Sequence, residues 1–319
     1  MKKILYLDCP SGISGDMFLG SLIDCGLGLK RLASQLRRMR ISSYSLKARK
    51  VTRAGITGVK FDVIYKKHHG QEHSRNKTFK GIVKAVRSSA LSNRVKERSV
   101  AVFTNLAKAE SKAHGVPLEK VHFHEVGDID SVVDIVGACI ALEELEIREV
   151  YCSRIVVANP APAAAYLLQG LDIAITGMPY ELVTPTGAAI LKTFSRPQID
   201  MPPMRILKTG YGAGSREIPE RPNLLRSIIG EGQINGDADI VTVLEGNIDD
   251  MNPQIYEHII DRLFEAGALD VYITPTIMKK SRPACVLTVL AGPSKADILS
   301  EVIFEEAPTF GLRRYTAER

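Results

Sequence analysis

Apolar and polar residues follow strand-like and helical periods in turn along the first two thirds of the chain. Lys3–Leu7 and Val150–Val157 are short apolar runs that predict buried strands, and Tyr44–Val51 with Val59–Tyr65 predict a strand pair joined by the turn AGITG. Apolar spacing typical of helices recurs at 17–27, 29–39, 79–90, 93–114 and 131–145. Strands alternating with helices predict an N-terminal α/β domain.

The pattern changes after a stretch rich in Gly, Asn and Asp at 230–239, which we interpret as a linker. A strand at Ile240–Gly246 is followed by a helix, two strands around a basic turn, another helix and a final strand. That order, β-α-β-β-α-β, is the ferredoxin-like pattern. We therefore predict two domains, an α/β domain at 1–236 and a ferredoxin-like domain at 237–319, so that the whole chain is of the α/β (α+β) class.

Composition places the chain among ordinary globular proteins. It has 319 residues, of which 45% are hydrophobic and 24% charged. No stretch reaches the roughly 18 uncharged apolar residues that a membrane span needs. Asp8 interrupts the first apolar run, which favours a strand over a signal peptide. Five cysteines without a CxxC pair favour a reducing compartment, so we expect a cytoplasmic protein.

The net charge of +6 is mild for this length and suits an anionic small molecule or a nucleotide. RNA binding through the basic N-terminal helices is a minor hypothesis. Aromatic residues make up 6% of the chain and Trp is absent, so surfaces for stacking single-stranded bases are scarce. We do not expect nucleic acid as a partner.

The segment HFHEVGDIDSVVD, from His122 to Asp134, concentrates groups able to bind metals or move protons. In an extended stretch His122 and His124 point to one face, and on the following helix Asp130 and Asp134 share a face. A strand end leading into a helix is where α/β proteins place ligands. The alternative is a surface turn in which Asp130 caps the helix.

A second histidine group, His68, His69 and His73, lies in the polar segment at about 66–77. Neutral imidazole suits Ni, Zn and Cu, so this segment is a candidate metal-collecting loop. The alternative is an exposed loop without a ligand.

Glycine-rich segments form candidate anion sites. DCPSGISGD follows the first strand and places Ser14, Gly15 and Asp16 at a helix start, and TPTGAAILK does the same with Thr186 and Gly187. The alternative for both is a tight turn. LKTGYGAGSRE at 207–217 predicts a turn with positive φ angles, or a close approach of the backbone to a ligand.

The C-terminal domain carries acids at one predicted strand end and bases in a hairpin and on the last strand. Carboxylates that hold Mg²⁺ or Mn²⁺, together with cations for phosphate, are the ingredients of nucleotide polyphosphate binding. Helix capping and surface pairing are the alternative. The set comprises Glu245, Asn247, Asp249, Asp250, Lys279, Lys280, Arg282, Arg313 and Arg314.

Long motifs, in a fixed order, resemble one family. They are KILYLDCPSGISGDMFLG, HFHEVGDIDSVVDIVGA, TPTGAAILK, GYGAGSRE with RPNLLR, NIDDMNPQIYEHIIDRLFEAGALDVYITPTIMKKSRP and EEAPTFGLRRYTAER. Together they resemble the LarC-type nickel-insertion proteins.

The resemblance implies a lyase that inserts nickel into pyridinium-3,5-bisthiocarboxylic acid mononucleotide, forming Ni–S bonds and a Ni–C bond. The product is the nickel-pincer nucleotide cofactor of lactate racemase and its relatives. It further implies that CTP is hydrolysed to CMP and diphosphate with a divalent ion such as Mn²⁺ or Mg²⁺, and that the C-terminal domain binds the CTP.

Residue roles follow from the spacing and the resemblance together. We expect nickel to be gathered by His68, His69, His73, His122, His124 and Asp128. Glu125 or His124 would take the proton that the ring carbon loses when Ni–C forms. Ser14, Gly15, Asp16, Thr186 and Gly187 would bind the substrate. Asp249, Asp250, Lys279, Lys280, Arg282, Arg313 and Arg314 would bind CTP with its metal ion.

Two departures from the family pattern bear on activity. The segment CSRIVVANPAPA after Tyr151 is shorter than in relatives, and the chain ends at Arg319 where relatives continue, so we expect a truncated C-terminal domain. They keep open the alternative of a nickel-binding chaperone or storage protein without turnover, or a degenerate family member. The expected partners are the nucleotide substrate, nickel, the recipient racemase apoenzyme and further copies of the chain in a homo-oligomer, with no membrane.

Overall fold

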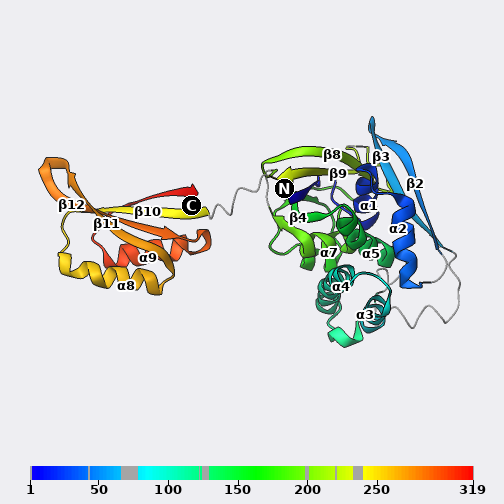
Figure 1. Ribbon diagram of the computed structural model, residues 1–319, viewed down its shortest axis with the longest axis horizontal. Helices are drawn as coiled ribbons and strands as arrows, with labels where there is room; N and C mark the ends of the chain where they lie inside the picture. Colours follow the sequence, from blue (N-terminus) through cyan, green and yellow to red (C-terminus); the bar gives the residue numbers. More distant parts are fainter. Residues whose placement is uncertain are drawn as a thin grey trace. The chain divides into compact units, whose positions relative to one another are not determined.

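The computed structural model describes residues 2–41, 44–65, 78–121, 123, 129–197, 201–219, 221–232 and 240–318. The chain divides into two compact units, Met1–Gln233 and Ile234–Arg319 (Figure 1). The boundary predicted between 236 and 237 falls in 233–239, outside the described residues. The linker prediction for 230–239 is wrong at its start, because Gly230 and Gly232 belong to a strand.

The first unit is built on a mixed sheet of seven strands in the order β2-β3-β8-β9-β1-β4-β7. Strand β1 pairs in parallel with β4 and antiparallel with β9, so it lies at the centre of the sheet. The strands are β1 (Lys2–Asp8), β2 (Tyr44–Arg53), β3 (Ile56–Tyr65), β4 (Ile147–Cys152), β7 (Ser195–Pro197), β8 (Met204–Ala213) and β9 (Leu224–Gly232).

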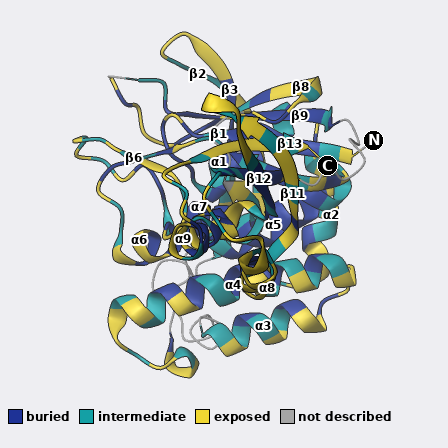
Figure 2. Cartoon of the chain, turned by 90° about the vertical axis from the view of Figure 1, so that its left-hand side faces the viewer, coloured by how far each residue is buried: buried dark blue, intermediate teal, exposed yellow. Residues whose placement is uncertain are grey.

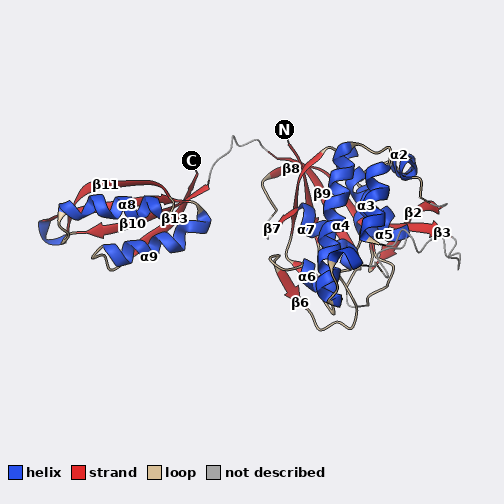
Figure 3. Ribbon diagram, turned by 90° about the horizontal axis from the view of Figure 1, so that it is seen from below, coloured by secondary structure: helices blue, strands red, loops and turns tan. Residues whose placement is uncertain are grey.

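Helices gather on one side of this sheet in two layers (Figures 1 and 3). In the inner layer α1 packs directly on β3 and β8, and α5 packs on α1. In the outer layer α4 crosses α5, α6 and α7, and α3 packs on α4. The helices are α1 (Gly15–Asp24), α2 (Leu29–Leu36), α3 (Phe79–Ser88), α4 (Asn93–His114), α5 (Ile129–Glu144), α6 (Pro162–Leu167) and α7 (Pro185–Phe194), with 3₁₀ turns η1 (Arg37–Met39) and η3 (Leu118–Lys120).

Apolar periodicity explains these layers. The stripe predicted on α4 at Val95, Val102, Leu106 and Ala109 is buried throughout, whereas the outward residues of α3 and α4 are exposed (Figure 2). Helix α5 is buried over most of its length because it packs on α1, β3 and β4 and is covered by α4. None of the described helices has the length and apolarity that a membrane crossing requires.

Strand β8 shows why glycines recur in GYGAGSRE. A Cβ on Gly212 would overlap the carbonyl of Met17, and a Cβ on Gly210 would overlap that of Ser21. The glycines therefore let α1 approach the sheet closely. The positive-φ turn predicted for this segment is wrong, because the positive-φ glycines of the described chain include neither residue.

The run Val150–Val157 is not one strand, as predicted, but parts of two. Strand β4 ends at Cys152 in the main sheet, and β5 (Ile155–Val157) pairs in parallel with β6 (Ile173–Ile175) in a separate small sheet. The chain turns where the Ser153 N–H donates to the carbonyl of Leu7 at 2.8 Å and its hydroxyl accepts from the Cys9 N–H at 3.0 Å. These two bonds fix the position of the loop that follows β1.

The second unit contains the predicted β-α-β-β-α-β order. Its antiparallel sheet runs β11-β12-β10-β13, and α8 and α9 cover one face of it (Figures 1 and 3). Leu244, Leu287 and Val289 on that face pack with Ile259 and Leu299 of the helices into one core. The elements are β10 (Ile240–Ile248), η4 (Pro253–Ile255), α8 (Tyr256–Glu265), β11 (Ala268–Met278), η5 (Lys279–Ser281), β12 (Arg282–Ala291), η6 (Pro293–Lys295), α9 (Ala296–Glu306) and β13 (Leu312–Glu318).

Candidate functional site

The two glycine loops singled out in the sequence pair with each other. The Ile13 N–H donates to the carbonyl of Leu182 at 3.0 Å, and the Thr184 N–H donates to the carbonyl of Ile13 at 3.1 Å. A Cβ on Gly12, whose φ is +74°, would overlap the Leu182 carbonyl, and a Cβ on Gly187 would overlap that of Ile13. Both glycines are needed for this close approach, which sets the starts of α1 and α7 side by side.

Each of these helix starts presents backbone N–H groups. Thr184 caps α7 by accepting from the Gly187 N–H at 3.2 Å, and Pro185 occupies the first turn, where a missing N–H costs nothing. Ser14 occupies the N-cap position of α1 but makes no side-chain cap. Helix α5 begins at Ile129. Residues from the starts of all three helices line one pocket of about 390 Å³.

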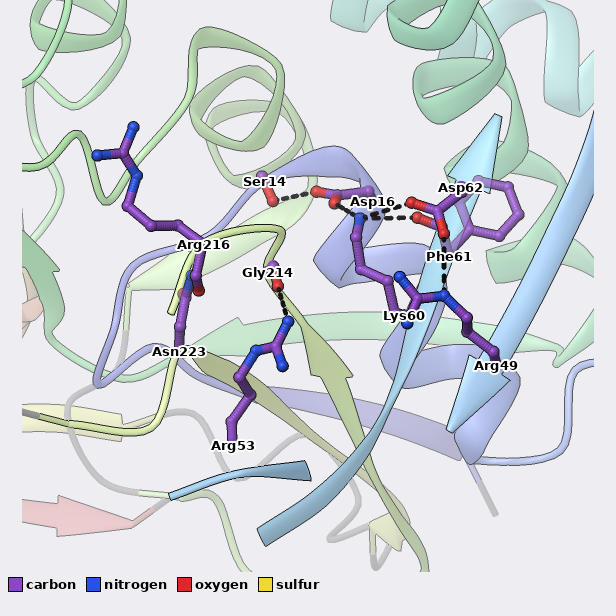
Figure 4. Close-up of polar contacts among 10 residues, drawn as sticks. All are labelled: Ser14, Asp16, Arg49, Arg53, Lys60, Phe61, Asp62, Gly214, Arg216 and Asn223. Atoms are coloured by element: carbon purple, nitrogen blue, oxygen red, sulfur yellow. Dashed lines mark hydrogen bonds and ion pairs between the residues drawn. The ribbon is translucent and has the colours of Figure 1, made fainter. Parts of the chain in front are cut away.

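A charged network from β3 forms one wall of this pocket (Figure 4). The ammonium of Lys60 forms an ion pair with Asp16, lies 3.3 Å from Asp62 Oδ1 and donates to the carbonyl of Phe61 at 2.9 Å. Its side chain is only 6% exposed. Asp16 also accepts from the hydroxyl of Ser14, so these residues fix one another before any ligand arrives.

Asp134 of α5 lines the same pocket. Its Oδ1 is buried and has no hydrogen-bond partner among the described residues. Burial raises the pKa of Asp134 well above its ordinary value, and the charges of Asp16 and Asp130 raise it further, while Lys60 opposes them. Asp130, one turn earlier on α5, lines the pocket as well. This agrees with the prediction that Asp130 and Asp134 share one face of the helix.

The loop after β8 closes a third side through Ser215. Asn223 organises this loop, since the Gly214 N–H donates to its carbonyl at 3.0 Å and its amide donates to the Arg216 carbonyl at 2.9 Å. The guanidinium of Arg216 lies over the ring of Tyr180, 5.1 Å from its centroid. The backbone of Arg216 is thus held by Asn223, while its side chain points away from Asn223 (Figure 4).

The structure brings four of the five predicted substrate-binding residues into this pocket: Ser14, Gly15, Asp16 and Thr186. Gly187 lies beneath them, against the backbone of Ile13 and Ser14. The predicted nickel and proton-transfer groups, His68, His69, His73, His122, His124, Glu125 and Asp128, lie outside the described residues. Within the described part of the chain no group of three or more His, Cys, Asp or Glu is placed to hold a metal ion.

Sequence reasoning missed Lys60, Asp62, Glu181 and Ser215 as parts of the pocket. One signal was present for the first two. In VKFDV, charges occupy alternate positions of an apolar strand, so they share a face. Lys60 is almost wholly buried there, and a buried charge requires partners.

In the second unit several of the predicted nucleotide-binding residues bond to one another. Arg313 donates to Glu245 at 3.0 Å and to Asn247 at 2.9 Å, and Arg282 donates to Asp249 at 3.2 Å. Lys279 and Lys280 form the exposed hairpin turn, where Lys280 has a φ of +62°.

Arg313 and Arg314 leave β13 on opposite faces. Arg314 is in register with Leu244, which belongs to the core under the helices, and it pairs with Asp297 of α9 at 2.5 Å. Arg313 is in register with Glu245, on the face that α8 and α9 leave open. A nucleotide lying on the open face would therefore meet Arg313 on its own side of the sheet, whereas Arg314 starts from the other side.

Comparison with known proteins adds to this geometry. A family model described as nickel insertion protein matches residues 5–319. A protein of Geobacillus kaustophilus named pyridinium-3,5-bisthiocarboxylic acid mononucleotide nickel insertion protein is 40% identical over 338 residues, covering 98% of this chain and 82% of that protein. A protein of the same name from Desulfitobacterium hafniense is 41% identical over 335 residues, covering 99% and 82%.

Among solved structures, the apo C-terminal domain of a cyclometallase involved in the synthesis of the NPN cofactor of lactate racemase is 41% identical. The match covers 25% of this chain and 56% of that one, with a TM-score of 0.25.

Proposed function

Because the chain belongs to the nickel insertion protein family, we propose that it inserts nickel into pyridinium-3,5-bisthiocarboxylic acid mononucleotide with consumption of CTP. The observation that carries this proposal is the convergence of the starts of α1, α5 and α7 on one pocket. Helix N-termini bind anionic groups such as phosphate, and this nucleotide carries a phosphate and two thiocarboxylates. The acids facing them suit the positive charge of its pyridinium ring.

Nickel enters this scheme as a substrate. The proposed donors are His68, His69 and His73, with His122 and His124 of the segment that directly precedes α5. The thiocarboxylate sulfurs of the nucleotide are softer ligands than imidazole or carboxylate, so they would draw the ion from these side chains.

The second unit supplies groups suited to CTP and its metal ion. Asp249 and Asp250 follow β10 directly, and carboxylate oxygens are the ligands that Mn²⁺ and Mg²⁺ prefer. Lys279, Lys280, Arg282 and Arg313 are cations suited to the phosphates. Arg313 and Arg282 already bond to acceptors that a bound nucleotide could share or replace.

The test is to incubate the full chain with the bisthiocarboxylate mononucleotide, Ni²⁺, Mn²⁺ and CTP. Mass spectrometry follows nickel in the nucleotide, and chromatography follows CMP. We expect both products, with neither formed when CTP is omitted. Nickel retained on the protein with no CMP and no nickelated nucleotide would instead indicate a nickel-binding protein without turnover.

A further inference from the structure

Asp134 differs from the other acids that line the pocket. Asp16 and Asp62 both bond to Lys60, and Asp62 also pairs with Arg49 at 3.7 Å. Asp130 accepts from the Ser131 N–H at 2.9 Å. Asp134 Oδ1 is buried and, within the part of the chain that the structure describes, has no hydrogen-bond partner. A buried carboxylate oxygen without a partner is costly to fold, so such a carboxyl group on a residue that lines a pocket points to a task there.

Lys60 cannot supply the missing partner. Its ammonium has three donors, and Asp16, Asp62 and the carbonyl of Phe61 take all three. The lysine also occupies the place between these acids where a metal ion would otherwise neutralise them. Of the residues that the structure describes, none therefore donates to Asp134 Oδ1.

The rest of the carboxyl group is held in place. Asp134 Oδ2 and Cβ pack against the Cα of Gly15 so tightly that a Cβ there would lie 2.5 Å from Oδ2. Asp134 is also in the second turn of a helix whose following residues are buried. The carboxyl group is thus positioned by two helices, as a group that must meet a substrate atom is.

We propose that the carboxylate of Asp134 is the base that takes the ring proton when nickel binds to carbon in the proposed reaction. This assignment rests on the proposed function and places the proton acceptor on α5. In the step, the C–H bond breaks at the ring carbon that lies between the two thiocarboxylate-bearing carbons. Its electron pair forms the nickel–carbon bond, the proton passes to Asp134, and nickel remains divalent, so no oxidant or reductant is consumed.

Proton affinity supports the role. Desolvation first, and then the charges of Asp16 and Asp130, raise the pKa of Asp134 against the pull of Lys60. Asp62 from β3 and Glu181 from the loop before α7 add negative charge around the same pocket. A carboxylate with a raised pKa is a stronger base than an exposed one and accepts a proton more readily near neutral pH.

The experiment compares the wild-type full chain with Asp134→Asn and Asp134→Ala. Asparagine keeps the shape but cannot take a proton, so nickelated product should form at least about 100-fold more slowly, while the Kd for the nucleotide changes by less than about threefold. Formate added to Asp134→Ala should restore part of the rate, because a free carboxylate can enter the vacated space. Asp172→Asn, an exposed site in the same unit, is the control for charge.

The outcomes separate the two claims. A wild-type chain that forms product, together with an Asp134→Asn variant within about threefold of its rate and with the same pH profile, overturns the assignment of Asp134 and leaves the proposed function standing. The rate can also fall without rescue by formate and with a matching loss of nucleotide binding. That result would make Asp134 a binding residue and would overturn its assignment as the base. A folded wild-type chain that forms no product overturns the proposed function itself, and the assignment with it.

Discussion

The carboxylate of Asp134 packs against the Cα of Gly15, so that a Cβ added at residue 15 would lie 2.5 Å from Asp134 Oδ2. These residues are far apart in sequence and belong to α5 and α1. Their contact brings the start of one helix against the side of the other. The pocket depends on this contact because both residues line it.

Gly15→Ala should destabilise the first unit by about 1–3 kcal/mol, because the new methyl group overlaps a side chain that has little room to move. Urea unfolding of the purified chain measures the loss. Gly177→Ala is the matched control, since a Cβ there meets nothing within 4 Å. The penalty should shrink when Asp134 is also replaced by Gly, and an unchanged penalty would show that the overlap is not its cause.

Asp134→Asn should stabilise the chain at neutral pH. The folded-state pKa of Asp134 is raised, so its contribution to stability is complete below the unfolded pKa of about 3.9 and is lost as pH rises through the folded pKa. Asparagine does not ionise, so the variant loses no stability at this position as the pH rises. The stability difference, measured by urea unfolding, should therefore grow from pH 5 to pH 8. A difference that is constant or falls with pH would contradict the raised pKa.

Lys60→Met should cost about 1–3 kcal/mol of unfolding free energy. It leaves Asp16 without a cation and leaves Asp62 only its 3.7 Å pair with Arg49. The cost of breaking a buried pair is reduced here because the Asp16 and Asp62 side chains are 24% and 32% exposed. Adding Asp16→Asn and Asp62→Asn to Lys60→Met should recover most of the loss. If the triple variant is no more stable than Lys60→Met, the ion pairs are not what the lysine contributes.

Arg313→Gln and Arg314→Gln should differ in their effect on CTP binding, because the two side chains lie on opposite faces of the sheet. Loss of a charge-assisted bond costs about 1.5–3 kcal/mol, or at least tenfold in Kd. We expect that loss for Arg313→Gln and a change below about threefold for Arg314→Gln, whose partner is the 85% exposed Asp297. Calorimetric titration with CTP and Mn²⁺ measures both. Equal effects would contradict the assignment to the open face.

Elements whose pattern is local were predictable from sequence. The stripe of α4 at Val95, Val102 and Leu106 is buried as predicted, and the strand and helix order from Ile240 onward is as expected. In both cases the periodicity of each segment is sufficient, because it does not depend on where the partner segment lies in the chain.

Features that depend on distant segments were not predictable. Nothing near Lys60 in sequence indicates that β3 passes the start of α1, where Asp16 neutralises it. The glycines at 210 and 212 look like turn residues until α1 is packed against them. The break between β4 and β5 likewise depends on Leu7 and Cys9, which bond to Ser153 across the sheet.

The most direct measurement is binding of pyridinium-3,5-bisthiocarboxylic acid mononucleotide to a chain whose pocket has been filled. Ser215 is exposed and lines the pocket, so Ser215→Trp should block it without disturbing the core. Ser88→Trp, at the exposed end of α3, is the control. We predict that Ser215→Trp weakens nucleotide binding at least tenfold and lowers nickelated product in parallel, while Ser88→Trp leaves both unchanged. Wild-type affinity in a folded Ser215→Trp chain would contradict the assignment of this pocket as the site of nickel insertion.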